Sequence, residues 1–230
     1  CGGGDALVVK GSNVLPTIAE AVGAGTPTEM YVKVKRLWLL PDASCKPETG
    51  KALSDYLVTN RETFEEFNLA QNPKLFTGSP IANTYNCMIL EMADTIKFRP
   101  DQVAEDTYGP EHCDATKDYY FDIFWGSDEW YNPVTGQNEA AQGTDQYATE
   151  AEYNTGYQST YMFATTDEEA VIAQYPEAET MVLTDPVVIT GGGSVELNFI
   201  VNTYNKITEG YSTVDTCSLE QPEISVLEAI

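Results

Sequence analysis

Alternating hydrophobic and polar residues recur along most of this chain. The most regular stretch is SVELNFIVNTY at residues 194–204, in which Val195, Leu197, Phe199 and Val201 fall on one face of an extended strand. Less regular stretches are rich in β-branched and aromatic residues, which also favour strands. They predict strands at residues 5–9, 30–40, 62–70 (where a helix is the alternative), 87–98, 117–125, 156–166, 179–190 and 223–230.

Helix signals are few. TDEEAVIAQYP at residues 166–176 has Thr166 as a candidate N-cap and Glu169 three residues later, which is a capping-box pattern. LPTIAEAVG at residues 15–23 predicts a second short helix. Strands separated by turn signals, without regularly alternating helices, predict an all-β fold. We expect an antiparallel β-sandwich of about eight strands with one or two short helices.

The pattern divides the chain into an N-terminal extension and one domain. Residues 1–28 are rich in Gly, Ala and Thr and form the extension, and residues 29–230 form the sandwich domain. A polar insertion at residues 126–158 interrupts the domain. It is longer than the roughly 12–15 residues of an ordinary irregular connection, which favours a functional loop or an inserted subdomain.

Aromatic residues are spread through this insertion among Asn, Gln, Thr and acidic residues. Aromatic faces beside amide groups suit either sugar stacking or protein contact. The sequence therefore predicts a binding surface in the insertion, and the alternative is a loop whose rings pack on their own domain. The candidate residues are Trp130, Tyr131, Tyr147, Tyr153 and Tyr157.

Acidic residues outnumber basic ones by 36 to 12, which gives a formal net charge of -24. Such a chain repels nucleic acid and anionic lipid headgroups, and it attracts cations or a basic partner. Asp, Asn and Gln oxygens at residues 113–122 and 126–146 suit calcium, although neither segment has EF-hand spacing. The alternative is a solvated acidic surface. We expect no cofactor, with calcium as the one candidate.

The first residues, CGGG, resemble the mature N-terminus of bacterial lipoproteins. In that family the signal peptide is removed directly before a cysteine, which is then acylated. The resemblance implies a lipid anchor on Cys1, with the glycines as a flexible leash. Gly2 in place of Asp implies the outer membrane by the enterobacterial sorting pattern. The alternative is a free or disulfide-bonded terminal cysteine.

A weaker resemblance extends over the domain. YVKVKRLWLLPDASC at residues 31–45, SPIANTYNCMILEM at 79–92 and GGGSVELNFIVNTYNKI at 191–207 resemble an uncharacterised group of bacterial β-sandwich lipoproteins. This resemblance implies the sandwich fold. It brings no catalytic residues with it.

Four cysteines remain when Cys1 is set aside for acylation, and an even number predicts two disulfides in an oxidising compartment. They are Cys45, Cys87, Cys113 and Cys217. Four cysteines allow three pairings, and the sequence does not choose among them. The alternative is four buried thiols. Their long spacings contain no C-x-x-C, which argues against a zinc cluster.

The N-terminal extension has features that suit contact with another protein. Leu7, Val8 and Val9 could add a strand to an open sheet edge of a neighbour. Leu15, Ile18 and Val22 could present a small apolar helical face to the same neighbour. We therefore expect residues 1–28 to contact a neighbouring subunit or membrane complex more than residues 30–230.

Catalytic motifs are not found in the sequence. It has one histidine, His112, in a loop-like setting, and no G-x-S-x-G, H-E-x-x-H, P-loop or G-x-G-x-x-G pattern. We expect that this protein is not an enzyme. The expected function is an exported, lipid-anchored accessory or structural subunit of an envelope or surface assembly, at the outer membrane or cell surface. The alternatives are a carbohydrate-binding or adhesion lipoprotein that uses residues 126–158, and an unrecognised hydrolase.

Overall fold

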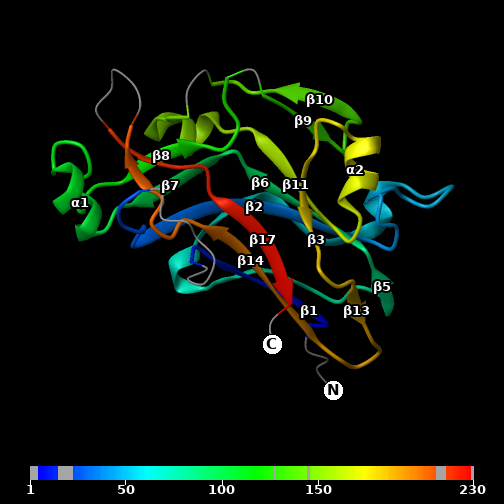
Figure 1. Cartoon of the computed structure of the whole chain (residues 1–230). Coiled ribbons are helices and arrows are strands. Elements are labelled where there is room, and N and C mark those ends of the chain that lie inside the picture. Colours follow the sequence, from blue (N-terminus) through cyan, green and yellow to red (C-terminus); the bar gives the residue numbers. More distant parts are fainter. Residues whose placement is uncertain (1–4, 15–22, 127, 144–145, 211–215, 229–230) are drawn as a thin grey trace.

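The computed structural model describes residues 5–14, 23–126, 128–143, 146–210 and 216–228. Within these ranges the chain is mostly β-structure, arranged in one seven-stranded sheet, one four-stranded sheet and three two-stranded ribbons (Figure 1). The predicted β-rich class is confirmed. Short helical segments lie between the strands: α1 (Gln102–Tyr108), α2 (Glu168–Gln174), η1 (Leu53–Tyr56), η2 (Leu69–Gln71) and η3 (Glu152–Gly156).

The larger sheet is built around its longest central strand, β2. Its members are β2 (Glu29–Leu40), β3 (Leu57–Asn68), β6 (Cys87–Ala93), β7 (Thr95–Arg99), β8 (Tyr119–Asp122), β11 (Ser159–Thr165) and β12 (Glu179–Val182). β3 pairs along one edge of β2, and β6 and β7 follow one another along the opposite edge. The single strand predicted at residues 87–98 is therefore present, but it is interrupted at Asp94.

The smaller sheet has the order β17-β14-β1-β4. Its strands are β1 (Leu7–Ser12), β4 (Lys74–Gly78), β14 (Val195–Asn202) and β17 (Glu223–Glu228). Figure 1 shows β17 and β14 side by side in front of β2 and β6. Apolar residues of both sheets join one buried cluster, and the Thr203 hydroxyl, just after β14, lies 3.8 Å from Met30 Sδ in β2.

The two sheets also approach each other along their sides. On one side the Thr59 hydroxyl of β3 donates a hydrogen bond to the Thr77 carbonyl of β4 at 2.8 Å. On the other side Leu183, directly after β12, forms an isolated parallel bridge with Val226 of β17. The inner face of the larger sheet is thereby enclosed by the smaller one.

The three ribbons complete the strands: β5 (Asn83–Tyr85) with β13 (Val187–Ile189), β9 (Glu129–Asn132) with β10 (Gln137–Ala140), and β15 (Ile207–Glu209) with β16 (Cys217–Leu219). The described residues thus contain seventeen strands, more than the eight or so expected, because many are only three or four residues long. The pairing is also not purely antiparallel, since β1 pairs with β14 and β11 with β12 in parallel.

All seven residues of β6 are buried, including the charged one, Glu91. Burying a carboxylate is costly unless it is paired and hydrogen-bonded. Arg36 Nε donates to Glu91 and forms an ion pair with it, and the Ser159 hydroxyl donates to its other oxygen at 2.9 Å. A strand buried on both faces shows no period of two, so this part of the sheet needs cover on both sides.

Both predicted disulfides are present, and the structure selects one of the three possible pairings. Cys45 is bonded to Cys87, across 42 residues, and Cys113 to Cys217, across 104 residues. The first bond ties the loop after β2 to the start of β6, and the second ties the loop after α1 to β16. Bonds that close loops of this length typically stabilise a fold by about 2–4 kcal/mol.

The helix predictions are right in part. α2 forms at the expected place, but its N-cap is Asp167, which accepts a hydrogen bond from the Ala170 N–H, and not Thr166. The Thr166 hydroxyl instead bonds to Asn86 at 3.2 Å. Helix α1 was not predicted, although Asp101 caps it in the same way. The helix expected at residues 15–23, with Leu15, Ile18 and Val22, falls mainly on residues 15–22, which lie outside the described residues.

The expectation that the N-terminal extension contacts another subunit is wrong for its described strand. β1 lies inside the smaller sheet, with β14 on one edge and β4 on the other. Leu7 and Val9 are fully buried, and Val8 is partly exposed on the opposite face. Leu7, Val8 and Val9 were expected to pair with an open sheet edge of a neighbour. They pair instead with β14 and β4 of the chain's own smaller sheet.

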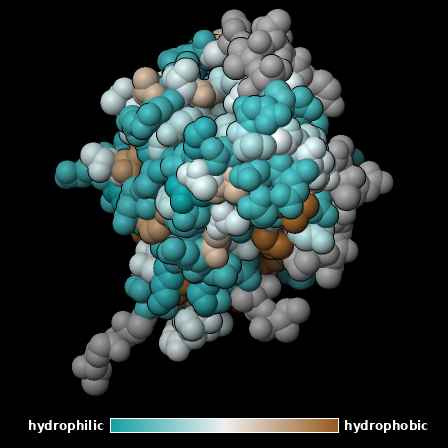
Figure 2. Space-filling model, turned by 90° about the vertical axis from the view of Figure 1, so that its left-hand side faces the viewer, coloured by the Kyte–Doolittle hydropathy of each residue, from teal (hydrophilic) through white to brown (hydrophobic). Residues whose placement is uncertain are grey.

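The surface agrees with the acidic composition. On the face shown in Figure 2, hydrophilic residues predominate, and strongly hydrophobic residues are confined to small patches. None of the helices in the described ranges is long and apolar enough to cross a membrane.

A pair of alanine substitutions in β1 tests whether this strand belongs to the fold. Leu7→Ala should lower the free energy of unfolding by about 2–5 kcal/mol, because it leaves a cavity in the core. Val8→Ala is the matched control, and it should cost less than about 1 kcal/mol because Val8 is on the other face. Urea unfolding measures both. Equal, small effects would mean that residues 7–12 are a tether outside the fold.

Candidate functional site

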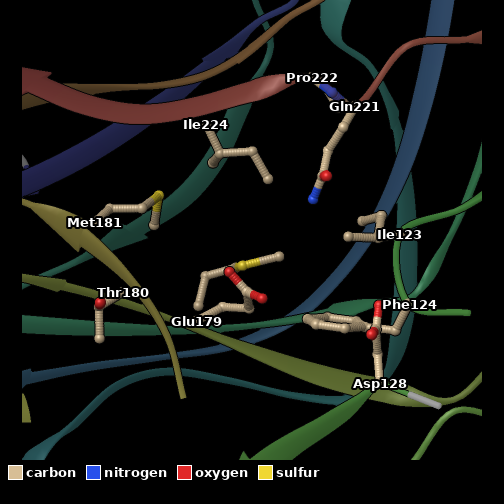
Figure 3. Close-up of a pocket in the computed structure, with 10 residues that line it drawn as sticks. Ile123, Phe124, Asp128, Glu179, Thr180, Met181, Gln221, Pro222 and Ile224 are labelled. Atoms are coloured by element: carbon tan, nitrogen blue, oxygen red, sulfur yellow. The ribbon is translucent and has the colours of Figure 1, made fainter. Parts of the chain in front are cut away.

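A cavity of about 190 Å³ lies where the β12 side of the larger sheet meets β17 of the smaller one. Figure 3 shows it from close by. Three elements and two connecting segments contribute to its walls. The lining residues are Ile123, Phe124, Asp128, Met162, Glu179, Thr180, Met181, Gln221, Pro222 and Ile224.

Strand pairing brings the wall residues together. Met162 of β11 is directly opposite Glu179 of β12 in the parallel pair, so their side chains share one face. Met181 follows two residues later on that same face. Ile224 projects from β17 on the opposite side of the cavity (Figure 3). The pocket is therefore held by rigid strands on two of its sides.

The apolar residues of the pocket wall are buried and pack against other side chains of the protein. Met162 and Phe124 are only 2% and 3% exposed, so the cavity reaches their side chains without opening them widely to solvent. The Phe124 ring stacks on Trp130 of β9 with a centroid distance of 5.0 Å and an interplanar angle of 29°. Trp130 thus fixes the position of a pocket wall without lining the cavity itself.

Three polar side chains surround the open part of the cavity. In Figure 3 the Glu179 carboxyl group and the Gln221 amide point toward the centre from opposite sides, and the Asp128 carboxyl group lies beside Phe124. Burial against the apolar wall raises the pKa of Glu179, and the negative charge of Asp128 raises it further. Asp128 and Glu179 also line an adjoining polar depression, together with Glu129 and Glu177.

The carboxylates of this region have no basic counterpart. All twelve Lys and Arg residues lie in the described ranges, and none of them lines the cavity. Within those ranges, neither Asp128 nor Glu179 takes part in an ion pair. The pocket therefore combines apolar walls with uncompensated negative charge, which suits a ligand with an apolar body and a positive end.

The aromatic residues predicted to form a binding surface pack mainly on the protein itself. Trp130 and Tyr153 are at most 1% exposed, so neither can stack on a ligand in this conformation, and the prediction is wrong for them. Tyr131 stacks on Tyr175 at 4.3 Å and Tyr157 packs edge-on against Phe64 at 5.2 Å. Tyr147 is half-buried and bridges to β8.

The physical reason lies in the outer face of the larger sheet. Tyr131 approaches Phe163 of β11, and Tyr153 lies over Lys33 of β2, whose Nζ is 4.1 Å from the ring centroid and donates to the Tyr153 carbonyl. Residues 126–158 thus include the layer that covers this face. Figure 1 shows β9, β10 and α2 together beyond β11.

Sequence patterns gave no direct signal for the cavity. Its walls come from five separate places in the chain, and its apolar members look like ordinary strand residues. Only Asp128 belongs to the insertion that the sequence singled out. The one usable signal is the acidic run around Glu177 and Glu179 at the start of a strand, and it is weak in a chain with 36 acidic residues.

The other candidate chemistry from the sequence is not assembled in the structure. His112 Nε2 lies 3.7 Å from a Glu209 oxygen, and in the part of the chain that the structure describes no serine bonds to it. No group of three His, Cys, Asp or Glu side chains in that part is placed to hold a metal ion, including the segments considered for calcium.

Two buried carboxyl groups lie close to the segment that forms the pocket wall. The Asp94 carbonyl accepts the Ile123 N–H at 2.8 Å, and Asp122 directly precedes Ile123. Burial raises the pKa of Asp94 to about 6 and that of Asp122 to about 7, and the negative charge of Asp94 contributes to the second shift. Among the described residues, Asp122 Oδ1 has no hydrogen-bond partner.

Comparisons with known proteins add nothing to this picture, since no family model, curated protein or solved structure matches the chain. The geometry and charge of the pocket are therefore the only guide to its role.

Replacing Trp130 distinguishes a core residue from a binding residue. Trp130→Ala should lower the free energy of unfolding by about 3–5 kcal/mol, because it removes a fully buried ring. Trp125→Ala is the control, since Trp125 is 42% exposed and its loss should cost less than about 1 kcal/mol. Thermal or urea unfolding measures both. A Trp130→Ala protein as stable as the wild type would restore the binding interpretation.

The buried carboxyl groups predict a pH dependence of stability. Because the folded protein holds these protons more tightly than the unfolded chain, the free energy of unfolding should fall as pH rises from about 4 through 7. Asp122→Asn should stabilise the protein by about 2–4 kcal/mol at pH 8 and by much less at pH 4. Asp185→Asn, at an exposed position, should change neither value. Parallel curves for Asp122→Asn and the wild type would assign the pH dependence to other groups.

Proposed function

We propose that this protein is an exported binding protein that acts by protein–protein contact and not by catalysis. The observation that carries the proposal is the pocket between β12 and β17, where Asp128 and Glu179 face apolar walls without any basic partner from the chain. Concave apolar sites with a few convergent polar groups are the usual form of binding sites. The lining residues include no His, Cys or Ser, so the pocket itself offers no nucleophile beside a histidine base.

Export is supported by the two disulfides, which are typical of oxidising compartments. Lipid anchoring through Cys1, and with it a place at the outer membrane or cell surface, rests on the resemblance of CGGG to lipoprotein N-termini. Cys1 lies outside the described residues. In this proposal the two larger sheets are the layers of a β-sandwich held at the membrane.

The role we propose is an accessory subunit of an envelope or surface assembly. Contact through Leu7, Val8 and Val9 is replaced by contact through the pocket, because β1 is already paired on both edges. A partner with basic surface groups is favoured by the net charge of -24, and nucleic acid is disfavoured by it. The burial of Trp130 and Tyr153 removes two of the five rings that the sugar-binding alternative would use.

Site-specific photo-cross-linking in native envelopes tests this function. A photoreactive residue at Met181, on the pocket wall, should cross-link one discrete envelope protein, and excess untagged protein should compete with it. The same residue at Val188, an exposed position on β13, is the control and should give no such product. Mass spectrometry of the cross-linked peptide identifies the contact. Equal products from both positions, or none from Met181 together with binding on a glycan array, would contradict the proposal.

A further inference from the structure

The pocket's charge and shape specify its ligand more closely than the proposed function alone. Its negative groups are held against apolar side chains, and the protein offers them no counter-ion. Other acidic groups form ion pairs with basic residues of the chain, for example Glu91 with Arg36 and Asp118 with Arg99. Asp128 and Glu179 are placed where a positive group from outside would complete the same kind of pair.

The apolar walls select for a ligand with a hydrocarbon stem. Phe124 and Met162 contribute apolar side chains to the wall, together with Met181 of β12 and Ile224 of β17. A cavity needs only about 10–15 Å³ to hold one water, so about 190 Å³ admits a short alkyl chain with a charged end. A bare metal ion would leave these walls without contacts.

We propose that the pocket binds the side chain of a lysine from the partner protein. The inference rests on the proposed function and names the group that the site recognises. The methylene stem packs between Met181 and Ile224, and the ammonium group reaches the Glu179 and Asp128 carboxylates.

Lysine fits the polar groups better than arginine. The Glu179, Asp128 and Gln221 side chains approach from different directions, and each has an oxygen that can accept a hydrogen bond. An ammonium group has three donors that point in separate directions, whereas a planar guanidinium group is matched to two oxygens of one carboxylate. Burial and the charge of Asp128 raise the pKa of Glu179, and a bound ammonium group would oppose this shift by favouring the ionised carboxylate, so binding should tighten as pH rises through the titration of that carboxyl group.

The five methionines of the chain make the site directly observable. In protein labelled with ¹³C at the methionine methyl groups, Nα-acetyl-L-lysine methylamide should shift the NMR signals of Met162 and Met181. The buried residues Met30, Met88 and Met92 are outside the lining and serve as internal controls. Nα-acetyl-L-norleucine methylamide has a similar stem without the charge, and it should bind at least about tenfold more weakly.

Two variants of equal charge separate the site from the general acidity of the surface. Glu179→Gln should weaken binding of the lysine probe at least about tenfold, and Asp185→Asn should leave it unchanged. If Glu179→Gln does not fold, Asp128→Asn takes its place. The proposal is overturned if the norleucine probe binds as well as the lysine probe, if the corresponding arginine probe binds more tightly, or if neither Met162 nor Met181 responds.

The two tests fail independently of each other. A specific Met181 cross-link without a response to the lysine probe overturns the ligand and leaves the proposed function standing. A response to the lysine probe without any cross-link supports the ligand chemistry and removes the support for a partner protein in the envelope.

Discussion

The rest of this structure depends on the need to bury both faces of the central strands. β6 has no exposed residue, and Phe163 on β11 is fully buried on the outer face while Met162 is buried on the inner one. A covering layer on one face alone would leave the apolar residues of the other face exposed to solvent. The four-stranded sheet covers the inner face, and the β9–β10 ribbon, α2 and η3 contribute the cover of the outer face.

The pocket between β12 and β17 is a consequence of this arrangement. On the β12 side of the larger sheet, the four-stranded sheet over the inner face ends at β17. The layer over the outer face begins there at Asp128 and β9. The border between these two layers leaves a cavity with apolar walls, and two of the three polar side chains around its open part, Asp128 and Glu179, are acidic. Trp130 of β9 belongs to the layer over the outer face, and its ring also stacks on Phe124 in the pocket wall. Trp130 therefore links the packing of the outer layer to the pocket for which we propose a binding role.

How far the sequence predicts the structure depends on which residues carry the pattern. Strands such as β14 were found because one face is apolar, and the disulfides were predicted in number but not in pairing, since pairing depends on tertiary distance. Trp130 and Tyr153 were misjudged because a ring that covers a sheet and a ring that binds a ligand have the same sequence context. The pocket was missed because strand pairing, not sequence proximity, joins Met162 to Glu179.

Native-state hydrogen exchange tests most directly whether residues 126–158 are part of the fold. The Tyr131 N–H bonds to the Glu177 carbonyl at 3.0 Å, and the β11 amides are paired within the larger sheet. If the insertion is a structural cover, the Tyr131 amide should exchange with the same free energy and denaturant dependence as amides of β11. Fast exchange of Tyr131, independent of denaturant, while β11 remains protected would show a loop that opens on its own and would contradict this account.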